Sequence, residues 1–346
     1  ACGNNDSKRL RDSGFQNPNL VLAPYTDIYG SHKTKKNILG QELSREIEAV
    51  GKDVILFKKG DQVFAANGPG FGSYAEYRSL PEKGAVALKP ANMIYEETAT
   101  VLTGGLSALH FLRKGNILGG EKVLINGAAG SIGTVEVQFA KHDGADVTGV
   151  DSKKKLDMLN AIGANHVIDY TQEDFTISGE TYNIIFDVAG KRSFSRSVRS
   201  LNRNGHYILA NPSLSLLVRG LWTSITNSKK MITGLAPEKT EGLIFLKELI
   251  EAETIKTVID RRYPLEQIAE AHSYIEPGQK AGDVVIRGAR QRNLTRRNTV
   301  SGSTVSRLKP VVGSDAGRRA GRPPSACRLR RFRVWADRPA SPLPGL

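Results

Sequence analysis

Short apolar runs alternate with runs of helical periodicity through the middle of the chain. Residues 123–125 are all apolar, and Ile132, Val135 and Phe139 then recur at the spacing of one helix face. A second apolar run ends at Asp151. Because an uninterrupted apolar run is typical of a strand covered on both faces, the pattern predicts a strand–helix–strand unit in a parallel sheet.

The same alternation continues toward the C-terminus. Helical patterns begin near Tyr95, and further strands are expected at residues 166–170, 182–187 and 205–210, with helices at 154–162 and 193–201. Strands that alternate with helices form a doubly wound parallel sheet, so an α/β fold is predicted for this part of the chain.

Residues 38–90 have a different pattern, which is rich in short strands. These are expected at residues 46–50, 62–66, 73–79 and 85–88, separated by Gly, Asp and Pro turns. They predict a small barrel-like domain. Beyond the large sheet, helices at 238–253 and 264–275 and short strands at 258–259 and 283–286 indicate a return of the chain to this first domain.

Five segments follow from these patterns. Residues 1–32 show no clear periodicity and receive no assignment, and the others are a β domain at 33–95, a sheet domain at 96–240, a return segment at 241–287 and a tail at 288–346.

A glycine-rich turn separates the first predicted strand from its helix. It reads Gly127, Ala128, Ala129, Gly130, Ser131, Ile132, Gly133. Glycine permits a sharp turn and a close approach of the backbone to a pyrophosphate, and the first N–H groups of the helix can bind its charge. Since Asp151 ends the next strand about 20 residues later, the context predicts a dinucleotide-binding site.

The charge of the chain is concentrated at one end. The 346 residues carry a net charge of +14, but residues 287–346 contain 15 Lys and Arg against 2 Asp and Glu. Residues 1–286 are therefore nearly neutral, with 34 basic and 33 acidic side chains. The tail has few apolar residues and is predicted to be disordered. The alternative is a basic arm that binds phosphates without regard to sequence.

Cysteine usage and hydropathy limit the environment of the protein. Cys2 and Cys327 are the only cysteines, which provides neither a disulfide framework nor a Cys-rich zinc site. No apolar run approaches the roughly 18 residues that span a membrane, and residues 1–6 contain no signal-peptide core. A cytoplasmic protein without a membrane partner is expected.

Several motifs together resemble one known family. They are ILGQELS at 38–44, FKKGDQV at 57–63, GFGSYAEY at 70–77, GGLSAL at 104–109 and the glycine turn at 127–133. In this order, over residues 33–287, the chain resembles the medium-chain dehydrogenase/reductase superfamily, in its zinc-lacking quinone-oxidoreductase branch. The resemblance implies a GroES-like barrel joined to a Rossmann domain, with NAD(P)H in the cleft between them, and a homodimer as in many relatives.

The chain departs from the family pattern in three places. Residues 1–32 do not resemble the strands with which members begin, which predicts an incomplete barrel. Arg45 stands where relatives usually have glycine, so it either strains a strand or points to solvent. The basic tail beyond residue 287 has no counterpart in the family.

Zinc is not expected. Zinc-dependent relatives have Gly-His-Glu where this chain has Gly40, Gln41 and Glu42, and glutamine is a poor zinc ligand. The six histidines lack ligand spacing: His32, His110, His142, His166, His206 and His272.

The choice between NADPH and NADH depends on conflicting residues. Asp151 suits the ribose hydroxyls of NADH and repels a 2′-phosphate. Ser152, Lys155 and Tyr170 match positions that hold this phosphate in NADPH-using relatives. NADPH is therefore favoured, with NADH left open. The alternative is that residues 153–155, all lysines, form a solvated helix start and that Tyr170 lies in the core.

Four further residues are candidates for cofactor contacts. Ser107 matches a hydroxyl position near the nicotinamide ribose in relatives, although helix packing alone would also explain it. Val188, Gly190 and Asn211 follow strands at their carboxyl edges, where ligands bind in open α/β sheets.

Three functions compete. The first is a zinc-independent oxidoreductase that transfers hydride to a quinone, enone or related carbonyl compound, with solvent water supplying the proton and no catalytic side chain nominated. Tyr74 and Phe71 are expected either at the substrate mouth or in the core. The second is an alcohol dehydrogenase or enoyl-reductase-like activity. The third is an inactive nucleotide-binding protein whose basic tail contacts nucleic acid.

Overall fold

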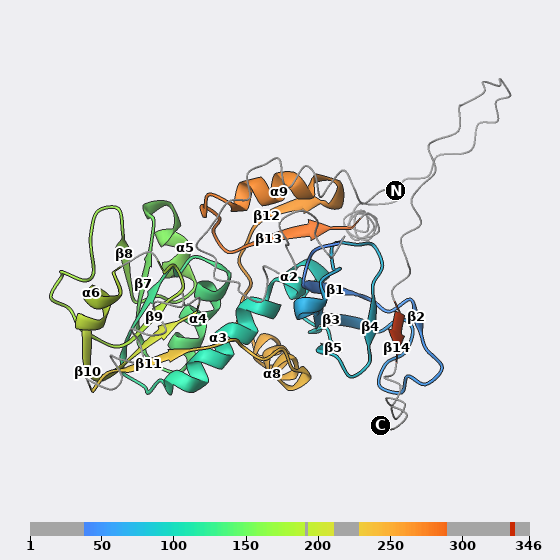
Figure 1. Cartoon of the computed structure of the whole chain (residues 1–346), viewed down its shortest axis with the longest axis horizontal. Helices are drawn as coiled ribbons and strands as arrows, with labels where there is room; N and C mark the ends of the chain where they lie inside the picture. Colours follow the sequence, from blue (N-terminus) through green and yellow to red (C-terminus); the bar gives the residue numbers. More distant parts are fainter. Residues whose placement is uncertain (1–37, 191–192, 211–227, 289–332, 336–346) are drawn as a thin grey trace, which may run out of the picture.

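The computed structural model describes residues 38–190, 193–210, 228–288 and 333–335. Figure 1 shows two regions rich in strands, joined by helices and by a third, smaller group of elements between them. Within the described residues, no helix is both long enough and apolar enough to cross a membrane.

The larger region is built on a six-stranded sheet. Its strands are β6 (Lys122–Asn126), β7 (Asp146–Asp151), β8 (His166–Asp169), β9 (Tyr182–Asp187), β10 (Leu201–Leu209) and β11 (Lys230–Thr233). Their order is β11-β10-β9-β6-β7-β8, and every pairing is parallel. The predicted doubly wound sheet is confirmed. Its direction of winding reverses beside β6, whose neighbours are β7 and β9, and ligands bind at such switch points.

Helices cover both faces of this sheet. They are α3 (Leu102–Gly115), α4 (Ser131–His142), the short 3₁₀ turn η2 (Lys153–Lys155), α5 (Leu156–Ala161) and α6 (Phe194–Arg199). Successive residues of β6 enter different cores, because Val123 and Ile125 pack with α4 while Leu124 packs on the side of α6. Burial on both faces explains why the strand is apolar without interruption.

The smaller region is a β domain that surrounds its own core. An antiparallel sheet orders β1 (Glu42–Glu46), β3 (Gln62–Ala66) and β5 (Val86–Leu88), and two short strands, β2 (Ala49–Val50) and β4 (Ser79–Pro81), lie beside it. Its buried side chains are Leu43, Ile47, Val63, Ala65, Leu80 and Val86. A short 3₁₀ turn, η1 (Gly68–Gly70), follows β3.

Two expected strands of this domain were only partly right. The range 46–50 contains the end of β1 and the whole of β2, with residues 47–48 between them outside any strand. Residues 73–78 form no strand, and β4 begins only at Ser79. Gly72 has a φ of +99°, and the N–H groups of Ser73 and Tyr74 donate to the carbonyls of Gly40 and Leu39. The alternation of side chains at 73–79 is typical of a strand. The backbone N–H groups of Ser73 and Tyr74 instead bond to residues 39–40, which belong to no strand.

One strand comes from the basic tail. Residues Arg333–Trp335 form β14, which pairs in parallel with β2 and β4. The sequence predicted no regular structure for 288–346, so these three residues differ from that expectation. The remainder of the predicted tail and the unassigned segment at 1–32 lie outside the described residues.

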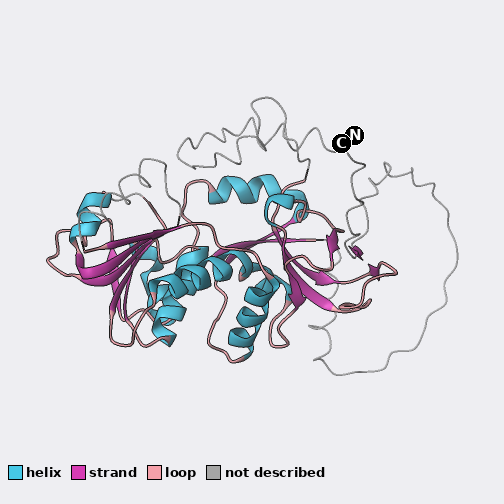
Figure 2. Cartoon of the chain, turned by 60° about the horizontal axis from the view of Figure 1, so that its bottom comes forward, coloured by secondary structure: helices cyan, strands magenta, loops and turns pink. Residues whose placement is uncertain are grey.

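The return segment lies between the two regions. It contains α8 (Thr240–Glu251), β12 (Ile259–Pro264), the short turn η3 (Leu265–Gln267), α9 (Ile268–Ile275) and β13 (Asp283–Arg287), and β12 and β13 pair in parallel. Figure 2 shows the strands of the large sheet at one end of the molecule and those of the β domain at the other, with helices between them.

A buried carboxylate ties the return segment to the β domain. Glu96 lies on α2 (Tyr95–Thr100) and is 6% exposed. Arg262 on β12 approaches it to 2.9 Å, and Arg287 on β13 approaches it to 2.6 Å. One side chain therefore holds three elements that are far apart in the sequence.

Replacement of Glu96 by glutamine is expected to lower the free energy of unfolding by about 2 kcal/mol. Removing one partner of a buried ion pair costs about 3–5 kcal/mol, and water reduces this here because both arginine side chains are about one-third exposed. Chemical denaturation measures the change. Glu180→Gln, which removes the exposed pair with Lys122, is the matched control and should leave the midpoint unchanged. Equal midpoints for both variants would contradict this role of Glu96.

Candidate functional site

The glycine-rich turn leaves β6 at the switch point of the sheet. Gly127 has a φ of +86°, which disfavours any side chain, and the N–H groups of Gly127 and Ala128 donate to the carbonyl of Val150 on β7. A methyl group on Gly127 would lie 3.1 Å from the backbone nitrogen of Ala189, which follows β9. The turn therefore contacts the carboxyl end of β7 on one side and the residues that follow β9 on the other.

Close packing holds α4 against this turn. A Cβ atom on Gly133 would collide with the carbonyl oxygen of Gly127 and would lie 2.7 Å from the carbonyl carbon of Ala128. On the opposite side, a Cβ on Gly104 of α3 would lie 2.5 Å from the carbonyl oxygen of Ser131. Both positions require glycine for contact between backbones, and together they place the start of α4 beside α3.

The first turn of α4 begins directly after the glycine turn and has no side-chain cap. Gly130 is its N-cap residue, with extended backbone, no side chain caps the helix, and the first turn holds no acidic residue. The first N–H groups of a helix have no partner within it, and the helix dipole makes this end positive. Ser131, Ile132 and Gly133 therefore lie where an anion such as a pyrophosphate is stabilised.

A buried ion pair lies at the end of β7. The side chains of Asp151 and Lys155 are 9% and 10% exposed, and their charged groups are 3.1 Å apart. The carboxylate also accepts N–H bonds from Ala129, at 3.1 Å, and Ser152, at 2.8 Å. Asp151 is thus already neutralised and bonded to the glycine turn.

The end of β8 adds an aromatic side chain to the same corner. The N–H of Tyr170 donates to the carbonyl of Asp151, and its side chain is about half exposed. This excludes the core position considered for Tyr170. The three residues that the sequence suggested for a 2′-phosphate, Ser152, Lys155 and Tyr170, therefore lie at one edge of the sheet.

A carboxylate that the sequence analysis did not nominate supports the loop after β9. Asp187 is 2% exposed and accepts bonds from the Asn126 amide at 2.9 Å, the Tyr207 hydroxyl at 2.6 Å and the Gly190 N–H at 2.8 Å. Burial and the neighbouring Asp187 charge raise the pKa of Tyr207. Val188, which is partly exposed, and Gly190 therefore lie on a loop that hydrogen bonds to the buried Asp187 hold in place.

The other two nominated residues are placed differently. Ser107 is half-buried on α3, one turn beyond Gly104, which contacts the start of α4. Asn211 lies outside the described residues.

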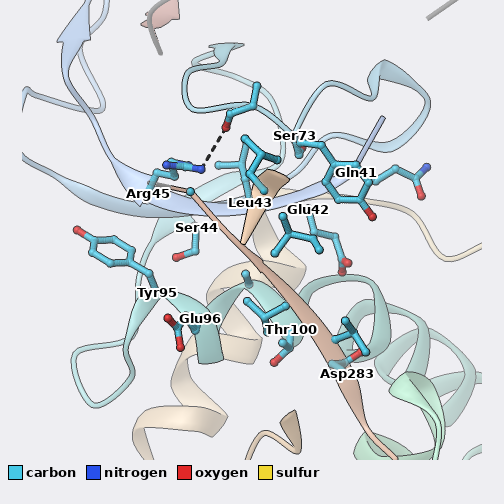
Figure 3. A pocket seen from close by; sticks show the side chains of 18 residues that line it. Gln41, Glu42, Leu43, Ser44, Arg45, Ser73, Tyr95, Glu96, Thr100 and Asp283 are labelled. Atoms are coloured by element: carbon cyan, nitrogen blue, oxygen red, sulfur yellow. Dashed lines mark hydrogen bonds between the residues drawn. The ribbon is translucent and has the colours of Figure 1, made fainter. Parts of the chain in front are cut away.

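A pocket lies between β1, α2 and β13. Figure 3 shows Glu42 of β1 and Asp283 of β13 in its wall, with Thr100 of α2 between these elements. Burial, then the neighbouring Asp283 and Glu238 charges, raise the pKa of Glu42 to about 7, against the lowering effect of an N–H bond from Thr103. Burial also raises the pKa of Asp283.

Arg45 also faces this pocket. Its guanidinium donates to the carbonyl of Ala75 at 3.1 Å, which Figure 3 shows as a dashed line. Burial lowers its pKa. Arg45 therefore does not point freely into solvent, which corrects one of the two expectations for it.

Comparison with known proteins decides the family. The model of the alcohol dehydrogenase GroES-like domain matches residues 21–90, and that of the zinc-binding dehydrogenase domain matches residues 162–286. A chloroplastic quinone oxidoreductase of Triphysaria versicolor is 31% identical over 257 residues, which are 71% of this chain and 78% of the relative. A quinone oxidoreductase of Pseudomonas aeruginosa is 30% identical over 72% of this chain and 81% of its own length.

This chain belongs to the medium-chain dehydrogenase/reductase superfamily. It falls in the quinone oxidoreductase-like branch, as the motifs predicted. The quinone oxidoreductase of Coxiella burnetii has the same fold, with a TM-score of 0.63 and 25% identity over 72% of this chain and 78% of that structure. The 2-methylene-furan-3-one reductase of Solanum lycopersicum is 30% identical over 71% of this chain, which spans 62% of that relative.

The family match begins earlier than the sequence analysis placed it. It includes residues 21–32, which showed no periodicity, and those residues lie outside the described part of the chain.

Gln41, which stands where zinc-dependent relatives have a ligand histidine, makes a hydrogen bond within the β domain. The Gln41 amide donates to the carbonyl of Gly68 at 3.1 Å. Among the described residues, no group of three His, Cys, Asp or Glu side chains is placed to hold a metal ion. Zinc independence stays a prediction.

Proposed function

We propose that this reductase transfers hydride from NADPH to quinones, enones or related electron-poor carbonyl compounds. The observation that carries the proposal is the glycine turn at the switch point, which leads into the uncapped N-terminus of α4. On one side Ala129 bonds the Asp151–Lys155 pair, and on the other it bonds Gly282, which precedes Asp283 of the pocket that Glu42 lines. The names of the relatives, quinone oxidoreductases and a furanone reductase, support the substrate class.

The residues present fit a dinucleotide along this edge. The N–H groups of Ser131, Ile132 and Gly133 would hold the pyrophosphate, and the glycines at 127 and 130 would let it approach the backbone. Ser107, Val188 and Gly190 are proposed contacts of the nicotinamide half. A reduced nicotinamide, when bound, supplies the hydride, while the chain orients the two reactants.

The corner at the end of β7 favours NADPH over NADH. A 2′-phosphate placed between Lys155 and Tyr170 would receive a cation and a hydroxyl, while Asp151 is occupied by two backbone N–H groups and by Lys155 itself. Neutralisation of Asp151 reduces its repulsion of a phosphate. The carboxylate that argued for NADH in the sequence is therefore engaged in the structure.

Titration with both cofactors tests this function. Nicotinamide fluorescence should show that NADPH binds at least about tenfold more tightly than NADH, which corresponds to about 1.4 kcal/mol. Steady-state assays with a simple quinone and a simple enone should then show consumption of NADPH. Binding without turnover on either substrate would contradict the reductase assignment, and tighter binding of NADH would contradict the cofactor assignment.

A further inference from the structure

The pocket between β1, α2 and β13, here called the Glu42 pocket, is joined to the glycine turn and the start of α4 by two separate connections. Glu42 accepts the N–H of Thr103 at 2.6 Å, and Thr103 precedes Gly104, whose backbone packs on Ser131. Asp283 follows Gly282, whose N–H donates to the carbonyl of Ala129 at 2.7 Å. Glu42 is therefore bonded to the residue before one contact of this segment, and Asp283 directly follows the other contact.

A lysine strengthens the second connection. The ammonium group of Lys280 donates to the Ser131 hydroxyl at 2.6 Å and lies 3.9 Å from the Asp283 carboxylate. Burial lowers the pKa of Lys280. Lys280 therefore joins the start of α4 to Asp283, which lines the pocket with residues of β1 and α2.

Reduction of an enone requires a proton as well as a hydride. Addition of hydride to the β-carbon leaves an enolate, and a positioned acid contributes typically 10²- to 10⁴-fold to such a step. The ideal acid has a pKa near the working pH. No described histidine lines this pocket, whereas Glu42 does and has a pKa of about 7.

Resting on the proposed function, we propose that Glu42 is the proton donor of this reductase. A reduced nicotinamide, when bound, would supply the hydride, with its electron pair, to the β-carbon of the substrate. The O–H bond of the Glu42 carboxyl breaks, its proton goes to the enolate, and the resulting carboxylate recovers a proton from solvent. For a quinone, the same proton completes the hydroquinone.

The surroundings of Glu42 raise the fraction of its acid form near neutral pH. Charged groups act on it from several elements: Asp283 on β13, Lys280 just before β13, and Glu238 before α8. Arg45 and Glu96 also line the pocket. Asp283 and Glu238 oppose its ionisation, while the Thr103 N–H favours it. Since the protonated form is the donor, activity should fall as the pH rises through about 7.

The test compares two substitutions on the same strand. Glu42→Gln keeps an oxygen that can accept the Thr103 N–H, but it has no acidic proton to transfer. Glu46→Gln removes the same charge from the exposed end of β1 and is the matched control. We expect kcat for an enone to fall about 100-fold in Glu42→Gln and to stay within twofold in the control. NADPH affinity and melting temperature should be unchanged in both.

Two measurements separate proton donation from a purely structural role of the bond between Glu42 and the Thr103 N–H. The loss of kcat above about pH 7 should disappear in Glu42→Gln, and an infrared carbonyl band of the protonated acid should disappear with it. Asp283→Asn retains Glu42 but removes a like charge, so its pH limb should move to lower pH. A Glu42→Gln variant with normal kcat, or an unmoved limb in Asp283→Asn, would overturn the assignment. Absence of turnover by the unmodified chain would instead defeat the proposed function itself.

Discussion

Replacement of Gly133 by alanine is expected to abolish the binding of both NADPH and NADH. The added Cβ would overlap the carbonyl oxygen of Gly127 and lie 2.7 Å from two backbone atoms of Ala128. Backbone atoms cannot move aside as a flexible side chain can, so α4 must shift away from the turn. Its first N–H groups would then lose their position relative to a pyrophosphate. Overpacking of this kind also costs roughly 1–3 kcal/mol of stability.

Fluorescence titration and thermal denaturation measure these two effects. Affinity for either cofactor should fall at least about 100-fold, or about 2.7 kcal/mol. Gly119→Ala is the matched control, because a Cβ there meets no atom closer than 3.7 Å. Gly119 lies in the turn before β6, at the end of this strand opposite to the glycine turn. It should bind both cofactors as the unmodified chain does. Normal binding by Gly133→Ala would show that the glycine turn is not the cofactor site.

Replacement of Lys155 by methionine is expected to remove the preference for NADPH. Charge-assisted hydrogen bonds contribute about 1.5–3 kcal/mol each, so NADPH affinity should fall about 10- to 100-fold. NADH has no 2′-phosphate, and its affinity should change by less than about threefold. Asp151 loses its cation but keeps the N–H bonds from Ala129 and Ser152, which limits the loss of fold stability.

A neighbouring lysine provides the control for this prediction. Lys154 carries the same charge one residue away, but its side chain is exposed and it is outside the ion pair with Asp151. Lys154→Met should lower the affinity for both cofactors only slightly, through the general field of the surface. If the two variants weaken NADPH equally, the specific role of Lys155 is refuted. The ratio of the two dissociation constants, NADPH over NADH, is the quantity to compare.

Buried strands were the part of the fold that the sequence predicted best. β9 has the predicted bounds 182–187, and β7 ends at Asp151 as expected. Both strands are covered on two faces, so apolar residues stand at consecutive positions in them. The edge strand β11 at 230–233 was not predicted, since its four residues carry little such pattern.

The candidate site also contains residues that the sequence nominated and residues that it missed. The sequence nominated the glycine turn and Asp151 because their spacing within one strand–helix–strand unit is local. It nominated Lys155 from its match to a position in NADPH-using relatives. Asp187 gave only a weak signal, as an acidic residue at a strand end. Glu42 was quoted only as part of a tripeptide that lacks a zinc ligand.

By itself, the sequence determined the doubly wound sheet and the glycine turn, because each depends on residues close together in the chain. It also determined the family, from motifs that follow one another in order over residues 33–287. Only the tertiary structure decided what the charged side chains do. It paired Asp151 with Lys155, turned Arg45 toward Ala75, and placed Glu42 near Asp283 from a strand more than 200 residues away. The pKa of a carboxyl group depends on burial and on nearby charges, and folding alone brings these together.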